Sequence, residues 1–331
     1  MAGVPVDLSP LGIPLTLPPE KWKRTVRICL PILSETGVVK SATGKVLFTL
    51  KGVHELGSGT FSFVEKYKQI FPDGKDSLVA VKRPRGGECD FLLEALLQWH
   101  LHRKLKEFGI DFCIPEVYTL FLHKPTGDVW FTMQAYEPVL LSQFCVKEMK
   151  TSSSAWTTFA LIMLQLALVL EVIEDEMGID HRDLKVNNML VVETPTRVSI
   201  DWKGNARILT FPFQIVLVDF GFSCWKGTLD IKNDDGLPPL DACPKEGRDL
   251  YQVIASLWHI GSLRTVLEDG WGAWIRDRLG SDEHHLVHDL NLMYGITDSK
   301  EFRAPLCAPR RVIHDMLVAL DAADKIETIV G

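Results

Sequence analysis

The chain has 331 residues, of which 46% are hydrophobic and 24% are charged, and its formal net charge is −7. This length suits one large domain or two packed lobes, and it can bury a sizeable core without metal or disulfide support. The negative charge argues against broad, nonspecific attraction to nucleic acid or to anionic lipid, so we expect neither nucleic acid nor a membrane as a partner.

Residues 1–45 are rich in proline and short apolar patches without a sustained period, which predicts an N-terminal extension. From Val46, "KVLFTLKGVHELGSGTFSFVEKYKQI" alternates apolar and polar residues around a Gly-rich break, which predicts two strands joined by a loop. A short strand ending in "VAVK", a helix over residues 89–108 and a hairpin over residues 116–136 follow. Residues 46–135 are therefore predicted to form a β-rich lobe with one helix.

The remainder, residues 136–331, is predicted to be mostly helical. A long helix over residues 153–178 opens with serines and closes on Gly178, as helices often do. Its apolar stretch is interrupted by Gln165 and Glu171 and is too short for a comfortable bilayer span, so we expect a buried helix. Short strands precede residue 220 and helical patterns follow residue 247. The predicted fold class is α+β, with a small sheet lobe before a larger helical lobe.

The cysteines indicate the compartment. There are seven, widely spaced and without a Cys-x-x-Cys pair, which favours reduced thiols over a disulfide framework or a zinc site: Cys29, Cys89, Cys113, Cys145, Cys224, Cys243 and Cys307. The N-terminus lacks a basic segment followed by an apolar run, so no secretory signal is expected. Both observations predict a cytoplasmic or nuclear protein.

A Gly-rich loop, "LGSGTFSFV", spans Leu56 to Val64 between two predicted strands. Glycines let backbone N–H groups approach a phosphate closely, although an isolated pair is more often a simple hairpin turn. The loop leads into a strand rather than a helix, which disfavours a Rossmann or Walker phosphate site. Lys82 at a strand end offers an ammonium for a phosphate, and Glu94 on the following helix, or its rival Glu88, offers an anchoring carboxylate.

The stretch "HRDLKVNNML" begins at His181 and lies between a buried helix and a strand, so it is a loop held by rigid elements. Asp183 can accept a proton from a substrate hydroxyl, and Lys185 can neutralise charge on a transferred phosphoryl group. Asn188 offers an amide oxygen to a hard cation such as Mg²⁺. Asp219 follows at the next strand end in "VDFGF", where a carboxylate suits a metal that bridges phosphates.

Taken together and in this order, "GSGTFSFV", "VAVK", a helical Glu, "HRDLKVNN" and "DFG" resemble the protein kinase signature set over about residues 50–260. The resemblance implies a bilobal fold, ATP as cosubstrate and Mg²⁺, or alternatively Mn²⁺, as the metal. It also implies that Lys82 grips the α- and β-phosphates and pairs with Glu94, and that Asp183 is the catalytic base. Lys185 would steady the γ-phosphate, Asn188 and Asp219 would hold the metal, and His181 and Arg182 would serve as scaffold.

The same resemblance implies a nucleotide pocket. Either Met133 or Gln134 would border the adenine, and the register between them is left open. The pocket would be lined by Leu56, Gly57, Ser58, Gly59, Thr60, Phe61, Val64, Ala80, Lys82, Met133, Gln134 and Tyr136.

Several features depart from the family pattern. Ser62 stands where a third glycine is usual, and residues 193–213 look like a hairpin inserted at the surface between the catalytic loop and "DFG". No "APE" follows, and "LPPLD" and "CPKEG" are weak substitutes, so the peptide-docking surface differs. The loose landmarks resemble divergent kinases, including some from large DNA viruses. In "GRDLYQ", Asp249 is expected to brace the catalytic loop through backbone hydrogen bonds.

The segment after Asp219 carries two hydroxyl residues that could be phosphorylated, Ser223 and Thr228. A phosphate there would normally pair with Arg182. We hypothesise that a carboxylate takes its place, or alternatively that the acidic residues only form a solvated loop: Asp230, Asp234, Asp235 and Asp241.

Lys185 in "HRDLKVNN" is typical of serine/threonine kinases. The predicted function is therefore an ATP-dependent protein kinase acting on a Ser or Thr hydroxyl of a protein substrate, with the oligomeric state left open. A small-molecule kinase on a related fold is the alternative, because "APE" is missing. A scaffold without activity is a third possibility, disfavoured because the lysine and both key aspartates are present.

Overall fold

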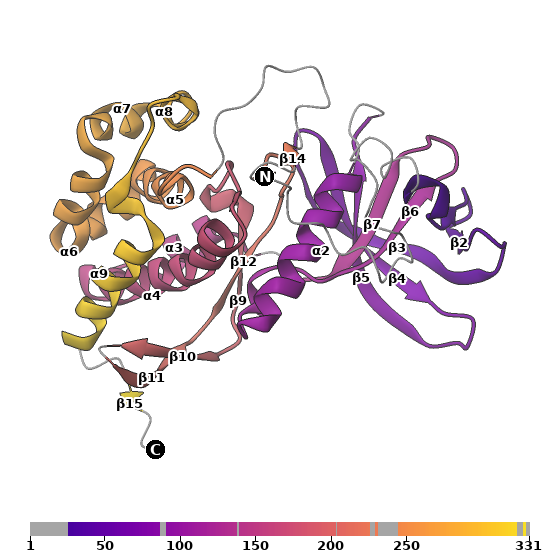
Figure 1. Cartoon of the computed structure of the whole chain (residues 1–331), viewed down its shortest axis with the longest axis horizontal. Helices are drawn as coiled ribbons and strands as arrows, with labels where there is room; N and C mark the ends of the chain where they lie inside the picture. Colours follow the sequence, from indigo (N-terminus) through magenta and orange to yellow (C-terminus); the bar gives the residue numbers. More distant parts are fainter. Residues whose placement is uncertain are drawn as a thin grey trace. The chain divides into compact units, whose positions relative to one another are not determined.

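The computed structural model describes residues 26–86, 91–137, 139–202, 204–225, 229–230, 244–322 and 327–328. They fall into two units, both drawn in Figure 1. The N-terminal unit contains the described residues up to 104 together with residues 114–137. The C-terminal unit contains residues 105–113 and the described residues from 139 onward.

The N-terminal unit is built on a closed barrel. Its strands are ordered β1 (Ile32–Leu33), β2 (Val38–Lys40), β3 (Val46–Ser58), β4 (Ser62–Ile70), β5 (Asp76–Pro84), β7 (Val129–Gln134) and β6 (Val117–His123). Neighbouring strands are antiparallel, except that β1 pairs with β6 in parallel and thereby closes the barrel. Because side chains alternate along a strand, each strand offers one face to the barrel core and one to the outside.

The two faces of β5 have different surroundings. Val79 and Val81 belong to an apolar cluster completed by Leu33, Val39, Phe48, Leu50 and Phe121. Ala80 and Lys82 alternate with them and face the other way. Helix α2 (Leu92–Glu107) lies beside the sheet (Figure 1). It covers that second face, where Gln98 Nε2 lies 3.5 Å from Met133 Sδ. The face that carries the predicted phosphate-binding lysine is therefore backed by α2.

The strands and helix predicted from residue 46 onward in this unit are present. The two shortest strands differ from prediction, because β1 and β2 lie within residues 26–45, which we predicted to be an extension, and they take part in the barrel. Strands of two and three residues are too short to show an alternating pattern, so the sequence carried no signal for them. Residues 1–25 lie outside the described part of the chain.

The C-terminal unit is mostly helical. Its helices are α3 (Leu141–Glu148), α4 (Ser152–Glu171), α5 (Arg248–His259), α6 (Gly261–Leu279), α7 (Glu283–His288), α8 (Leu292–Asp298) and α9 (Pro309–Ala322). Short helical turns lie at η2 (Asp111–Cys113), η3 (Val172–Glu176), η4 (Val186–Asn188), η6 (Gly280–Asp282) and η7 (Pro305–Cys307).

Helix α4 is the core of this unit and packs against α3, α5, α6 and α9. Thr151 and Ser154 form a reciprocal capping box at its start, and the helix begins at Ser152, one residue before the predicted start. The helix and the π-helical turn after it are long and apolar enough to cross a membrane by length and composition, but 67% of the most apolar window is buried inside the protein. That burial is what we expected of a core helix.

Short strands surround the catalytic loop: β8 (Ile179–Asp180), β9 (Met189–Val192), β12 (Gln214–Leu217), β13 (Cys224–Trp225) and β14 (Leu229–Asp230). Between β9 and β12 the chain forms an antiparallel hairpin of β10 (Thr196–Trp202) and β11 (Asn205–Phe211), which β15 (Glu327–Thr328) extends. Leu209 and Phe211 on β11 are buried. The sequence predicted a hairpin at the surface, whereas the hairpin is partly packed into the unit.

One prediction about the cysteines is wrong. Cys224 is disulfide-bonded, although we expected every thiol to be reduced. Wide spacing along the sequence does not reveal which cysteines meet in space, so spacing alone could not identify this bond. The described cysteines that are free are Cys29, Cys113, Cys145 and Cys307.

Candidate active site

The predicted catalytic loop connects β8 to β9 and has an unusual backbone. Among the described residues, only Arg182 and Asp219 are non-glycine residues with positive φ, and both have a φ of 67°. The left-handed region costs an ordinary residue on the order of 1 kcal/mol and persists only where surrounding contacts impose it. Both strained residues lie in the motifs that the sequence singled out, so these motifs form the candidate functional site.

Helix α5 supplies contacts that impose the loop conformation. The carboxylate of Asp249 accepts hydrogen bonds from the backbone N–H groups of His181, at 2.7 Å, and Arg182, at 2.9 Å. Asp249 is fully buried, so these bonds are shielded from water. The prediction that Asp249 braces the catalytic loop is confirmed.

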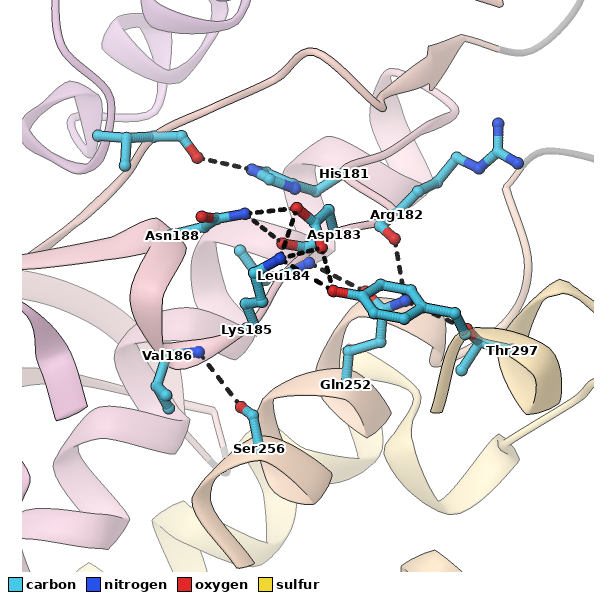
Figure 2. Close-up of polar contacts among 12 residues, drawn as sticks. His181, Arg182, Asp183, Leu184, Lys185, Val186, Asn188, Gln252, Ser256 and Thr297 are labelled. Atoms are coloured by element: carbon cyan, nitrogen blue, oxygen red, sulfur yellow. Dashed lines mark hydrogen bonds and ion pairs between the residues drawn. The ribbon is translucent and has the colours of Figure 1, made fainter. Parts of the chain in front are cut away.

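Two further residues of α5 brace the loop, and the sequence analysis missed both. Gln252 accepts from Leu184 N at 2.9 Å and donates to Arg182 O at 2.9 Å (Figure 2). Ser256 Oγ accepts from Val186 N at 3.2 Å. The signal was available, because Asp249, Gln252 and Ser256 are spaced three and four residues apart and form one polar stripe on an otherwise apolar, buried helix.

Asp183 lies where three donors converge. Lys185 Nζ lies 3.0 Å from Oδ1 and 3.1 Å from Oδ2, and Asn188 Nδ2 lies 2.8 Å from Oδ2 (Figure 2). The hydroxyl of Tyr294 on α8 donates to Oδ1 at 2.5 Å and is 3.0 Å from Lys185 Nζ. Asp183 is buried, whereas the Lys185 side chain is 31% exposed. The carboxylate is therefore held as an acceptor with a cation beside it.

The two residues predicted to hold a metal come from neighbouring strand ends. Leu217 pairs with Met189 across β12 and β9, and Val218 N donates to Asn188 O at 3.0 Å. Asp219 follows directly and is half-buried. Both hydrogen bonds that Asn188 makes to Asp183 use the amide nitrogen, so its amide oxygen is not consumed by them. A carboxylate and an amide oxygen so arranged fit a hard cation such as Mg²⁺.

In the N-terminal unit, Lys82 and Glu94 form the predicted ion pair through Nζ and Oε1. Their side chains are only 5% and 1% exposed. The Lys82 ammonium also lies 5.1 Å from the centroid of the Phe91 ring. The structure thus selects Glu94 as the partner, while its rival Glu88 lies outside the described residues.

Four of the residues predicted to line the nucleotide pocket share one face of the barrel, namely Val64, Ala80, Lys82 and Met133. Gly57 is paired with Val64, and Val64 with Lys82, so the Gly-rich loop stands beside the lysine. Ala80 pairs with Met133, which places Met133 on that face. By alternation Gln134 points to the opposite face, so the pairing favours Met133 as the residue that would border the adenine, and this choice stays a prediction.

The loop itself is a tight turn. Gly59 N donates to Ser62 O at 2.9 Å, which joins the ends of β3 and β4. Gly57, Ser58, Gly59, Thr60 and Phe61 are exposed, whereas Leu56 and Tyr136 are partly buried. Apart from Gly57 and its two chain neighbours, no heavy atom of the described residues lies within 4 Å of the position that a Cβ on Gly57 would take. The backbone of the loop is therefore open to an approaching anion.

Residues 140–235 match the model of the poxvirus serine/threonine protein kinase family. The matched segment contains Asp183, Lys185, Asn188 and Asp219 and does not extend into the N-terminal unit. The match confirms the predicted resemblance to the protein kinase superfamily and to a divergent viral branch of it.

The segment after Asp219 is only partly described in this kinase-like unit. Ser223 is fully buried, and its hydroxyl donates to His181 O at 3.4 Å. A phosphate could not be added to Ser223 without opening this packing. Thr228, Asp234, Asp235 and Asp241, and the side chain of Asp230, lie outside the described residues, so the proposed partner of Arg182 stays a prediction.

The electrostatics around the kinase-like loop favour a protonated Tyr294. Burial raises the pKa of the Tyr294 phenol, and its hydrogen bond to Asp183 adds to the effect. Burial alone would lower the pKa of Lys185, but the bonds and charges of Tyr294 and Asp183 raise it. At neutral pH Tyr294 is therefore a phenol and Lys185 an ammonium.

Behind the loop lie three buried carboxylates, Glu174, Asp180 and Asp249, with oxygens within 4.8 Å of one another. Burial and the charge of Asp249 raise the pKa of Asp180 to about 7, although Arg248 Nη1 lies 3.5 Å from its Oδ2. Burial also raises the pKa of Glu174 well above its ordinary value. The raised pKa values of Glu174 and Asp180 favour their neutral forms, which reduces repulsion among the three buried groups.

Proposed function

We propose that this chain is an ATP-dependent protein kinase that transfers the γ-phosphate of ATP to a Ser or Thr hydroxyl of a protein. The observation that carries the proposal is the environment of Asp183, which is buried, fixed by Asn188 and Lys185, and already bonded to a hydroxyl group. A carboxylate that binds a hydroxyl within hydrogen-bond reach is what a phosphoryl-transfer enzyme uses to orient its acceptor. The family match over residues 140–235 supports the same chemistry.

The residues of the C-terminal unit have separable roles. Asp183 accepts the proton of the acceptor hydroxyl as its oxygen attacks phosphorus. Lys185, whose ammonium contacts both Asp183 oxygens, balances negative charge on the phosphoryl group. Asp249 and Gln252 keep Asp183 in place through the loop backbone. These roles require positioning and charge, which account for most of phosphoryl-transfer catalysis.

The N-terminal unit offers Lys82 and the Gly-rich loop to a nucleotide, and the C-terminal unit offers Asn188 and Asp219 to a metal. Lys82, fixed by Glu94, presents its ammonium beside the Gly-rich loop, where a phosphate can accept from exposed backbone N–H groups. Asn188 and Asp219 would hold Mg²⁺, or Mn²⁺ in its place, and the metal would neutralise charge on the phosphates when bound. The lysine two residues after the catalytic aspartate favours Ser or Thr as the acceptor.

The test compares wild-type protein with Asp183→Asn, supplied with Mg²⁺ and labelled ATP and with three acceptor sets: a basic protein, a peptide array and a panel of small hydroxyl compounds. We expect labelled Ser or Thr in protein or peptide, and a loss of turnover in Asp183→Asn of about 10²-fold or more. ATP binding should survive the substitution. Asp277→Asn serves as the control, because that side chain is 67% exposed on α6 and touches none of the site residues named above.

Other outcomes would identify the competing functions. Label found only in small molecules would make the chain a small-molecule kinase. Wild-type protein that consumes no ATP with either Mg²⁺ or Mn²⁺ would be a scaffold. Undiminished turnover in Asp183→Asn would remove Asp183 from the mechanism.

A further inference from the structure

Tyr294 lies beside Asp183, although the two residues are far apart in the sequence. Its hydroxyl lies 2.5 Å from Asp183 Oδ1 and 3.0 Å from Lys185 Nζ. In the proposed reaction, an acceptor hydroxyl must donate to this same carboxylate before it attacks phosphorus. The phenol of Tyr294 therefore stands in the acceptor position.

Helix α8 fixes this position. Thr297, on the same helix as Tyr294, accepts a hydrogen bond from Gln252 at 3.2 Å, and its carbonyl accepts from Lys245 Nζ at 3.1 Å. Gln252 also bonds the catalytic loop, so the loop and α8 share one buried brace. The phenol is consequently presented to Asp183 by packed structure rather than by a mobile tail.

We propose that Tyr294 is an intramolecular autophosphorylation site of this chain, an inference that rests on the proposed kinase function. The phenol oxygen would form a bond to the γ-phosphorus of ATP as the bond from that phosphorus to the β,γ-bridging oxygen breaks. The phenol proton passes to Asp183 and ADP leaves. The product is phosphotyrosine at residue 294, and ATP supplies the whole phosphoryl group.

Three other tyrosines, Tyr67, Tyr118 and Tyr251, do not share this geometry. The chain contains five tyrosines. Tyr251 is buried with its hydroxyl 3.4 Å from Asp282, and Tyr67 donates to Glu65 at 3.3 Å. Tyr118 is 47% exposed on β6. The fifth, Tyr136, belongs to the N-terminal unit. Among the other four, only Tyr294 bonds Asp183, so we expect the modification at Tyr294.

The modification has a consequence for the same site. A phosphotyrosine carries a charge of about −1.5 to −2 and no longer has a hydroxyl proton to donate. It cannot keep its bond to the carboxylate of Asp183, so the phosphorylated side chain leaves the acceptor position. Phosphorylation of Tyr294 should therefore precede full activity toward an external substrate.

The experiment incubates purified full-length protein with Mg²⁺ and ATP and maps phosphotyrosine by mass spectrometry over time. We expect up to one phosphate per chain, at Tyr294, at a rate independent of protein concentration over a 100-fold dilution. Peptide phosphorylation should show a lag that disappears after preincubation with ATP. Asp183→Asn should acquire no phosphate at this residue. Tyr118→Phe is the matched control and should label like the wild type, while Tyr294→Phe should lose the phosphotyrosine and the lag.

Three results would overturn the proposal. One is wild-type protein that phosphorylates the peptide but never carries phosphate at Tyr294, in which case the kinase function stands and only this inference fails. Another is a labelling rate proportional to protein concentration, which would assign the transfer to a second molecule. The third is equal labelling of Tyr294 in Asp183→Asn that still binds ATP. A protein that labels neither the peptide nor itself would instead refute the kinase function.

Discussion

At the scale of single residues, the site depends on charges that are removed from water. Lys82 and Glu94 are the clearest pair, because both side chains are almost fully buried and their charged atoms are in contact. Burying one charge without its counter-charge is costly, whereas replacing both by apolar groups of similar size is often tolerated. Replacing one residue of the pair should therefore lower the free energy of unfolding much more than replacing both.

We expect Glu94→Gln to destabilise the protein by about 3–5 kcal/mol, because it removes the counter-charge of a buried ammonium. The double variant Lys82→Met/Glu94→Leu should recover most of that loss while losing ATP binding. Urea unfolding at pH 7 measures both. Asp73→Asn is the control, since Asp73 and its partner Lys75 have side chains that are 55% and 83% exposed, and no change should be measurable. Equal losses in the single and double variants would contradict this account.

The sequence predicted the residues of the site only where they lie in short motifs. Asp183, Lys185 and Asn188 are neighbours along the chain, and the β9–β12 pairing brings Asp219 to them. Tyr294 is 111 residues away from Asp183, so no local pattern could reveal their contact. Nor could the sequence decide between Met133 and Gln134, because that choice depends on a strand register that only the pairing with Ala80 fixes.

At the scale of elements, α5 acts as the template for the catalytic loop. The acceptors and donors of Asp249, Gln252 and Ser256 bind five backbone groups between His181 and Val186. A loop with a left-handed residue at Arg182 would relax without them. The helix was predicted from its apolar period, but of its polar stripe only Asp249 was predicted to brace the loop.

Gln252→Leu is expected to lower kcat on the order of tenfold while leaving the Kd for ATP unchanged. The substitution removes the acceptor of Leu184 N–H and the donor to Arg182 O in a buried site, which costs about 1–3 kcal/mol. Gln252→Glu keeps the acceptor, so its kcat should lie between those of the wild type and of Gln252→Leu. Ser256→Ala loses a single loop bond, so a smaller effect is expected. Steady-state kinetics with calorimetric ATP binding measures all three. A rise in the Kd for ATP equal to the fall in kcat would argue for general unfolding instead.

At the scale of the whole molecule, the barrel shows how a domain boundary drawn from sequence differs from the folded one. The recognisable pattern begins at Val46, yet Leu33 and Val39 contribute to the same apolar cluster as Phe48 and Phe121. β1 closes the barrel through only two residue pairs with β6. A chain that begins at Val46 would lack both closing strands.

We predict that a chain truncated before Val46 unfolds at a lower temperature than one truncated before Val26, which keeps every strand of the barrel. Losing the buried side chains of Leu33 and Val39 removes about 1.5–3 kcal/mol each, before any effect of opening the barrel. Circular dichroism during heating measures the difference. Identical melting curves for the two truncations would show that β1 and β2 are dispensable.

Barrel closure also governs how the protein behaves at high concentration. A closed barrel has no row of unpaired N–H and C=O groups to recruit a strand from another molecule. Within the described residues, the β1–β6 pairing is the closing seam of this barrel. Loss of β1 and β2 would expose the long strand β3 on one side and β6 on the other, and each could pair with a strand of another molecule. The few residues of β1 and β2 thus keep the edges of β3 and β6 paired, which should help the protein to stay soluble.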